Sequence, residues 1–161
     1  MDSIIFDVDG TLWDSTEIVA EAWNDYLTNT EHMDTDVSSR RLMGLFGQLL
    51  PDIAKALFPK LPESEQLRII DGCCQAEHEA LLRKCAPLYP QLEETLKNLS
   101  ARFPLFIVSN CQAGYIEVFL QATGFGHYFK GHLCPGDTGM AKAENIMKIR
   151  DDFDLKDPVY V

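Results

Sequence analysis

The sequence has too few basic residues to bind a nucleic-acid backbone or an anionic membrane through charge. Its 161 residues include 14 Lys and Arg against 25 Asp and Glu, which gives a formal net charge of -11. An acidic chain is repelled by the phosphates of DNA and of lipid headgroups. We therefore expect neither a nucleic acid nor a membrane as a partner.

The sequence also lacks the patterns of a membrane span, a secreted disulfide framework and a zinc site. No apolar run approaches the roughly 20 residues of a spanning helix, and Asp2 stands where a signal peptide would be basic. The 5 cysteines form no CxxC pair, and their odd number disfavours a disulfide framework. None of the 4 histidines forms a spaced pair, so we assign none to a metal. These absences predict a cytoplasmic protein with reduced thiols.

Three short apolar runs predict buried strands. The first, Ser3–Phe6, leads into Asp7, the second, Leu105–Val108, leads into Ser109, and the third covers 159–161 after Pro158. Helical patterns at about 114–123 and 141–153 lie between the second and third runs. Strands that alternate with helices predict a parallel sheet with right-handed crossovers.

The segment 15–86 breaks this alternation because it has helical periodicity and no convincing strand. Gly44, Pro51, Pro59 and Pro62 punctuate it, and we expect helices at about 16–30, 38–43, 47–58 and 64–85. The sequence thus predicts a Rossmann-like, doubly wound α/β core, formed by residues 1–14 and 87–161, with an inserted helical cap at 15–86. Trp13 and Trp23 are expected to pack in the interior rather than line a pocket.

Polar residues follow the first two predicted strands, where ligands of doubly wound sheets collect. Asp7 and Asp9 are two residues apart on a loop whose turn Gly10 permits. One carboxylate can attack a phosphoryl group while the other moves protons. After the second strand, Ser109 offers a hydroxyl and Asn110 a backbone N–H before a helix, which suits an anion. Taken alone, the first loop is also an ordinary Asp/Gly turn, and Ser-Asn is an ordinary helix cap.

The run Asp7-Val8-Asp9-Gly10-Thr11-Leu12, followed by Asp14-Ser15, resembles the first signature of the haloacid dehalogenase superfamily. The similarity is to its phosphoglycolate phosphatase-like and β-phosphoglucomutase-like branch. The resemblance implies that Asp7 is the nucleophile and a ligand of Mg²⁺. It implies that Asp9 protonates the leaving oxygen, activates water and binds Mg²⁺ through its carbonyl. It also assigns Thr11 to phosphate binding.

Two later motifs fit the same resemblance. Ser109 and Asn110 match the family's second, phosphate-binding motif. Lys142, in Ala-Lys-Ala-Glu-Asn-Ile, matches the third, in which a lysine neutralises the phosphoryl oxygens and the nucleophile. Lys148 and Lys156 are read as solvated charges. In related caps, loop residues equivalent to 44–48 face the site, and the hinges are expected near 12–15 and 86–92.

The family's fourth motif, a Gly-Asp turn and a further acid after the last strand, is not present before Val161. Gly136-Asp137-Thr138 is predicted to be a surface loop rather than that turn. If the chain ends here, its core is incomplete, Mg²⁺ binding is expected to be weak, and strand 159–161 is expected to self-associate through its edge.

The favoured function is Mg²⁺-dependent hydrolysis of a small phosphorylated metabolite through a phosphoaspartyl intermediate, impaired in a truncated chain. Two alternatives stay open. A sugar phosphomutase of the same superfamily would use the same two aspartates, although Thr11 followed by Leu12 is more similar to phosphatases. A truncated or fragmentary member would be non-catalytic.

Overall fold

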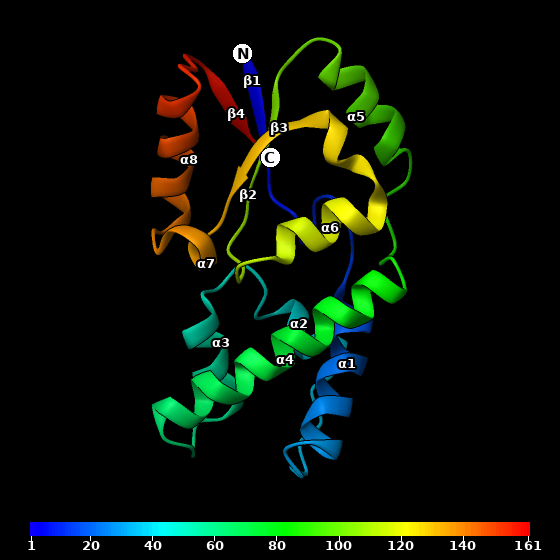
Figure 1. Cartoon of the computed structure of the whole chain (residues 1–161), viewed down its shortest axis with the longest axis vertical. Coiled ribbons are helices and arrows are strands. Elements are labelled where there is room, and N and C mark those ends of the chain that lie inside the picture. Colours follow the sequence, from blue (N-terminus) through cyan, green and yellow to red (C-terminus); the bar gives the residue numbers. More distant parts are fainter.

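The protein is built around one parallel sheet, described by a computed structural model that covers all 161 residues. Its strands lie in the order β3-β2-β1-β4, and every neighbouring pair is parallel (Figure 1). They are β1 (Ser3–Phe6), β2 (Leu105–Val108), β3 (Phe129–Leu133) and β4 (Pro158–Tyr160). The predicted α/β architecture with a parallel sheet is therefore confirmed.

Helices cover both faces of this sheet, because successive strand residues point to opposite sides. Ile4 and Ile107 pack on one face in the main core, together with residues of α5 (Leu92–Ser100) and α6 (Tyr115–Thr123). Ile5 and Phe106 face the other way and pack with Ile149 of α8 (Lys142–Asp152). The central strands β1 and β2 read as continuous apolar runs because both of their faces are buried.

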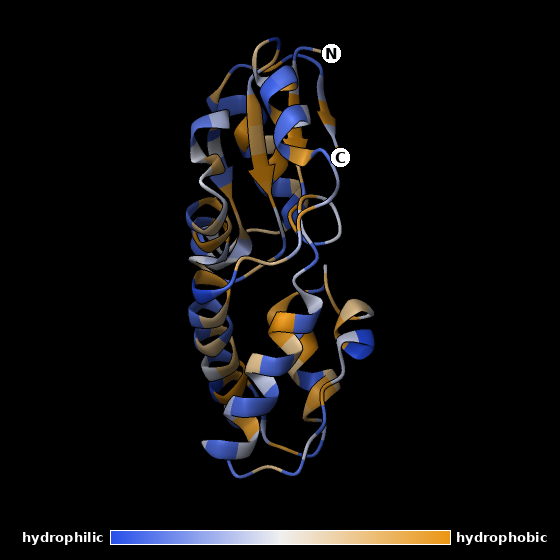
Figure 2. Cartoon of the chain, turned by 90° about the vertical axis from the view of Figure 1, so that its right-hand side faces the viewer, coloured by the Kyte–Doolittle hydropathy of each residue, from blue (hydrophilic) through white to orange (hydrophobic).

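Four helices form a separate layer beyond the carboxyl ends of the strands (Figure 1). They are α1 (Thr16–Asn29), α2 (Ser39–Met43), α3 (Leu50–Leu57) and α4 (Glu63–Arg83). The long helix α4 packs along α1 and α3 and also contacts α6 of the sheet region. Most of its buried residues are apolar, with Glu77 as the buried acid, and hydrophobic and hydrophilic residues alternate along the helices of this layer in Figure 2.

The chain passes twice between the sheet region and the helical layer, and the two passages lie side by side. The backbone N–H of Asp14 donates to the carbonyl of Pro87 at 2.9 Å, and Trp13 forms an isolated bridge with Leu88. Trp13 is 0% exposed, and Trp23 in α1 is 2% exposed. Both tryptophans are thus buried, as the sequence indicated, and Trp13 anchors the passage between the two regions. Trp23 also lines a small cavity, contrary to the expectation that neither tryptophan lines a pocket.

Three elements of the sheet region differ from the sequence expectation. Strand β3 and helix α5 were not predicted, and residues 136–138, predicted to be a loop, belong to the short helix α7 (Pro135–Thr138). Its Gly136 donates its N–H to the carbonyl of Cys111 at 3.1 Å, and a Cβ at Gly136 would lie 2.0 Å from the backbone N of Ala113. The helix forms because glycine lets it approach the loop after β2 this closely.

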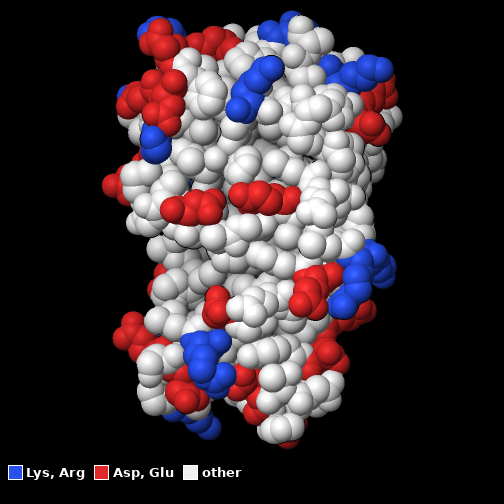
Figure 3. All heavy atoms as spheres, viewed as in Figure 1, with Lys and Arg blue, Asp and Glu red and all other residues white.

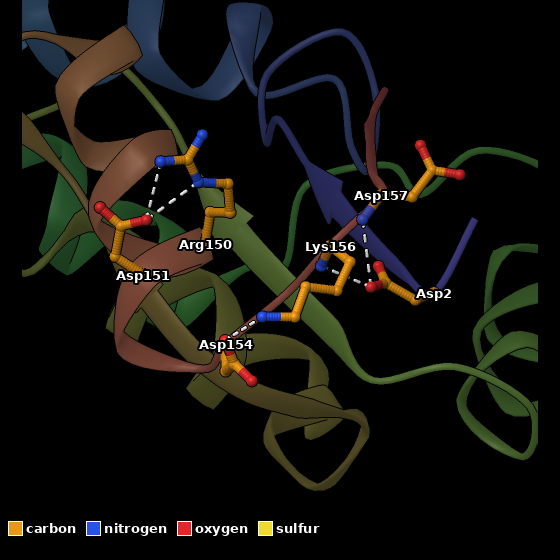
Figure 4. A network of polar contacts seen from close by, with 6 residues as sticks. All are labelled: Asp2, Arg150, Asp151, Asp154, Lys156 and Asp157. Atoms are coloured by element: carbon orange, nitrogen blue, oxygen red, sulfur yellow. Dashed lines mark hydrogen bonds and ion pairs between the residues drawn. The ribbon is translucent and has the colours of Figure 1, made fainter.

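A polar network fixes the start of β4 against the N-terminus (Figure 4). The carboxylate of Asp2 accepts the backbone N–H groups of Lys156 at 2.6 Å and Asp157 at 3.1 Å. Nearby, Arg150 contacts Asp151 at 2.8 Å. These contacts hold the last strand in register beside β1.

On the face seen in Figure 3, the basic side chains lie in small groups among acidic ones and form no continuous patch. None of the helices is both long enough and apolar enough to cross a bilayer.

Candidate active site

The loop that follows β1 opens a pocket between the sheet and the helical layer. Gly10 has a φ of +75°, which glycine adopts at little cost, and this allows the chain to turn directly after Asp9. The pocket has a volume of about 290 Å³. Its lining comes from both regions and consists of Asp7, Asp9, Gly10, Asp14, Ser15, Thr16, Met43, Phe46, Gly47, Tyr89 and Ser109.

Asp7 lies at the carboxyl end of β1 and pairs with a lysine from the far end of the sequence. Its Oδ1 accepts the N–H of Val8 at 2.9 Å, and its Oδ2 lies 2.6 Å from Nζ of Lys142. The two side chains are 23% and 21% exposed, so water screens this pair only in part. Burial alone would lower the pKa of Lys142, but the hydrogen bond and the charge of Asp7 outweigh it, and the pKa is raised. Lys142 is therefore a permanent positive charge beside Asp7.

Asp9 is surrounded by hydrogen-bond donors on one of its two oxygens. Its Oδ1 accepts from the hydroxyl of Tyr115 at 2.6 Å, from the hydroxyl of Ser15 at 2.8 Å and from Nε1 of Trp13 at 3.3 Å. Burial raises the pKa of Asp9 to about 6, although these three hydrogen bonds oppose the shift and the negative charge of Asp7 adds to it. A carboxyl with such a pKa can give and take a proton near neutrality.

The loop after β2 brings Ser109 to the same pocket. Ser109 is 3% exposed and lies at the end of the sheet beside Asp7 and Asp9. The side chain of Asn110 turns toward the helical layer, where Nδ2 donates to the carbonyl of Gly47 at 2.8 Å. Neither Asn110 nor Thr11 lines the pocket, and Lys142 reaches it only through its contact with Asp7. Asp7, Asp9 and Ser109 are thus assembled directly, while the other three candidates surround them.

The helical layer closes the pocket from above with residues that follow α2. Within the segment 44–48, Phe46 and Gly47 line the pocket, and Met43 at the end of α2 joins them. Tyr89, from the returning passage, adds an aromatic side. The pocket therefore has an acidic, polar floor formed by the strand loops and an apolar roof.

Oxygen donors at this floor fit a magnesium ion. Mg²⁺ is usually held by one or two carboxylates together with water molecules and substrate phosphate oxygens. Asp7, Asp9 and Asp14 all line the pocket, and Asp7 is partly accessible. Asp14 accepts from the hydroxyl of Thr16 at 2.6 Å, and Oδ1 of Asp9 accepts three hydrogen bonds. No group of three or more His, Cys, Asp and Glu side chains is arranged as a complete protein cage.

Several residues of the site were not assigned a role from the sequence. Ser15 and Tyr115 both contact Asp9, and the hydroxyl of Tyr115 also donates to that of Ser15 at 3.0 Å. Glu77 of α4 is buried nearby. The Asp14-Ser15 pair was part of the recognised signature and was the only available signal for Ser15. Tyr115 and Glu77 occur within ordinary helical patterns, so nothing in the sequence marked them.

The sequence and the fold were compared with those of known proteins. Residues 4–159 match the profile of the family described as haloacid dehalogenase-like hydrolase. No curated protein matches the sequence.

Many solved structures share the fold. A haloacid dehalogenase-like family hydrolase from Streptococcus pneumoniae aligns with a TM-score of 0.81 and 22% identity over 99% of this chain and 74% of that one. A protein from Haemophilus somnus, described as a predicted phosphoglycolate phosphatase, aligns with a TM-score of 0.82 and 22% identity over 99% of this chain and 76% of that one. A predicted phosphatase from Clostridium acetobutylicum aligns with a TM-score of 0.78 and 18% identity over 99% of this chain and 74% of that one. At these identities the structural likeness concerns the fold.

Proposed function

Because the chain belongs to the haloacid dehalogenase-like hydrolase family, we propose that it hydrolyses a small phosphomonoester through a phosphoaspartyl intermediate. A carboxylate oxygen of Asp7 attacks phosphorus, and the bond between phosphorus and the ester oxygen breaks. Asp9 gives its proton to the departing oxygen. Water then attacks the phosphoryl group on Asp7, and Asp9 accepts a proton from that water, which regenerates both carboxyl groups.

The charges at the pocket support these roles. Asp7 is held beside Lys142 with 2.6 Å between Oδ2 and Nζ, so the lysine offsets part of the repulsion between the nucleophile and an anionic phosphate. The hydroxyl of Ser109 and the backbone N–H of Asn110 are the proposed donors to the phosphoryl oxygens. Thr11, on the same loop as Asp7 and Asp9, is proposed as a third contact.

Asp7 and the carbonyl of Asp9 are the proposed protein ligands of Mg²⁺. When bound, the ion supplies positive charge that stabilises the phosphoryl oxygens and keeps the nucleophile ionised. Asp9, whose pKa burial raises to about 6, retains the ability to carry a proton at its carboxyl group. The roof residues Met43 and Phe46 exclude water from the leaving group.

The observation that carries this proposal is the joining of three separate segments at one pocket. Asp7 and Asp9 follow β1, Ser109 follows β2, and Lys142 begins α8, yet Asp7 contacts Lys142 and lines a pocket with Asp9 and Ser109. A nucleophile, a proton carrier, a donor and a cation in one partly enclosed space form the constellation that phosphoryl transfer requires.

The test is the hydrolysis of p-nitrophenyl phosphate with Mg²⁺ and with a chelator, by the wild type and by Asp7→Asn. We expect turnover that requires both Mg²⁺ and Asp7. Asp25→Asn is the matched control, because Asp25 is exposed on α1 and contacts only Asn29, at 2.7 Å. Turnover by Asp7→Asn at the wild-type rate would exclude Asp7 as the nucleophile. A folded wild type without turnover would exclude the proposed activity for this chain.

A further inference from the structure

A second, smaller cavity adjoins the proposed active site on the side of the leaving group. Its volume is about 30 Å³, and it shares Asp9, Phe46 and Gly47 with the larger pocket. A space of this size holds a water molecule or a group of similar size. Since Asp9 is the proposed donor to the leaving oxygen, a substituent on the leaving group lies within reach of this cavity.

Two acids and an amide with one unpartnered oxygen are among the residues that line the small cavity. Glu77 on α4 is 3% exposed, and both of its carboxyl oxygens face donors, Nε1 of Trp23 at 2.6 Å and Nε2 of Gln112. Oδ1 of Asn110 is a buried acceptor without a hydrogen-bond partner. Asp9 completes the lining with a second carboxyl.

No lysine or arginine lines this cavity. A buried carboxyl is ordinarily paired with a cation, because burying its charge alone is costly. Here burial raises the pKa of Glu77 to about 8, hydrogen bonds from Gln112 and Trp23 oppose the shift, and the charge of another acid, Asp9, adds to it. The chain therefore places two acids and one unpartnered acceptor at a small cavity that has no cation among its lining residues.

We propose that this cavity is a subsite for a primary ammonium group on the leaving alcohol, so that the substrates are phosphomonoesters of short amino alcohols. The proposal rests on the proposed function above. An ammonium group is about as large as water, donates three hydrogen bonds and neutralises a carboxylate. Asp9, Glu77 and Asn110 Oδ1 together offer it acceptors from both regions of the protein. Glu77 is then the specificity-determining residue.

Three phosphate esters of similar size test the proposal: ethanolamine phosphate, ethylene glycol monophosphate and 2-phosphoglycolate. Their leaving groups carry an ammonium, a hydroxyl and a carboxylate. We expect kcat/KM of the wild type to fall in that order, by about tenfold at each step, because a charge-assisted contact is gained in the first and a repulsion between carboxylates opposes the last. Equal values for the first two esters would overturn the proposal.

The variant Glu77→Gln removes the charge and keeps the size of the side chain. The ratio of kcat/KM for ethanolamine phosphate to that for ethylene glycol monophosphate is expected to fall about tenfold. The ratio for 2-phosphoglycolate to ethylene glycol monophosphate is expected to rise. A uniform loss on all three esters, which a merely structural role would produce, would contradict the assignment. Glu77→Asp, which retains the charge, should recover part of the preference for ammonium.

A control variant and a binding measurement complete the test. Glu79→Gln is the matched control, since the side chain of Glu79 on the same helix is 73% exposed and points away from the cavity toward Arg83. Calorimetric binding to Asp7→Asn compares ethanolamine phosphate with ethylene glycol monophosphate without turnover. Tighter binding of the ammonium ester would support the subsite even if p-nitrophenyl phosphate is not hydrolysed, and equal affinities would exclude the subsite while leaving the hydrolase activity intact.

Discussion

Replacing Tyr115 with phenylalanine is expected to raise the pKa of Asp9 and to speed the hydrolysis of alkyl phosphates at neutral pH. The hydroxyl of Tyr115 donates to Oδ1 of Asp9 at 2.6 Å, and this hydrogen bond stabilises the ionised carboxylate. Phenylalanine keeps the edge-to-face packing against Trp13, whose ring centroid lies 5.9 Å away. The substitution therefore removes the contacts of the Tyr115 hydroxyl with Asp9 and with Ser15 and leaves the aromatic packing.

The size of the expected shift in the pKa of Asp9 follows from the strength of one hydrogen bond to a charged group. A loss of about 1.5 kcal/mol raises a pKa by about one unit, and Ser15 and Trp13 still donate to Asp9 in the variant. Since the acid form of Asp9 protonates the leaving group, activity falls as pH rises through its pKa, which is about 6 in the wild type. About a tenth of Asp9 is then protonated at pH 7. With a pKa near 7, about half is protonated, a gain of about fivefold.

The assay is the pH dependence of kcat/KM for ethylene glycol monophosphate, with p-nitrophenyl phosphate as a second substrate. The alkyl ester has a poor leaving group and requires the proton, whereas p-nitrophenolate leaves with little help. We expect the alkaline limb for the alkyl ester to move up by about one pH unit in Tyr115→Phe. The titration of the substrate itself is the same for both enzymes and cancels in the comparison.

The control is Tyr128→Phe, since the ring of Tyr128 packs against Phe125, with ring centroids 5.8 Å apart, and Tyr128 does not contact Asp9. Its alkaline limb should coincide with that of the wild type. If the alkaline fall of kcat/KM in Tyr115→Phe occurs at the same pH as in the wild type, or at a lower pH, then Asp9 is not the proton donor or Tyr115 does not lower its pKa.

Three other outcomes are expected. Lys142→Met should lower kcat for p-nitrophenyl phosphate by at least about a hundredfold. Lys148→Met removes only a surface contact with Asp152 at 2.8 Å and should leave kcat unchanged. Similar losses of kcat in both variants would contradict the role of Lys142. In the folded protein Glu77 has a pKa of about 8, above its ordinary value. As the pH rises from about 5 to about 8, the free energy of unfolding of the wild type should therefore fall relative to that of Glu77→Gln, by on the order of a few kcal/mol. A difference in Tm that does not vary with pH would oppose this. We also propose that the 161-residue chain associates through β4, an edge strand in which Val159 and Tyr160 are each 40% exposed. Light scattering that shows only monomer at every concentration would contradict this proposal.

Two of the three strands that the sequence predicted are buried throughout, whereas the third, β4, lies at a sheet edge and is largely exposed, so the expectation that it is buried was wrong. Ser3–Phe6 and Leu105–Val108 are buried along their whole length and therefore read as uninterrupted apolar runs. Strand β3 was missed because Phe129–Leu133 includes Lys130, Gly131 and His132 and lies at a sheet edge, where partial exposure tolerates such residues. The strand forms because its backbone pairs with β2, although its composition does not favour a strand.

The sequence identified candidate residues that follow a strand end or belong to a signature. It did not identify residues that reach the site only through the packing of helices. Asp7, Asp9 and Ser109 follow strands β1 and β2, so the parallel sheet alone brings them to one edge. Tyr115 reaches Asp9 only because α6 packs on that edge, at a sequence separation of 106 residues. Glu77 reaches the cavity only because α4 packs against α6. Periodicity predicts both helices but not which face meets the site.

The loop after β2 joins the phosphate site to the helical layer. Ser109 lines the pocket, while Nδ2 of Asn110 donates to the carbonyl of Gly47 and Gln112 donates to Glu77. Both contacts cross from the sheet region to the helical layer, and they begin within three residues of Ser109. A movement of the helical layer about the passages at Asp14 and Pro87 would break these contacts before it disturbed the sheet. If Ser109 binds phosphate as proposed, we expect the ligand to favour the position of the helical layer that preserves them, because a ligand shifts an equilibrium by its difference in affinity for the two states.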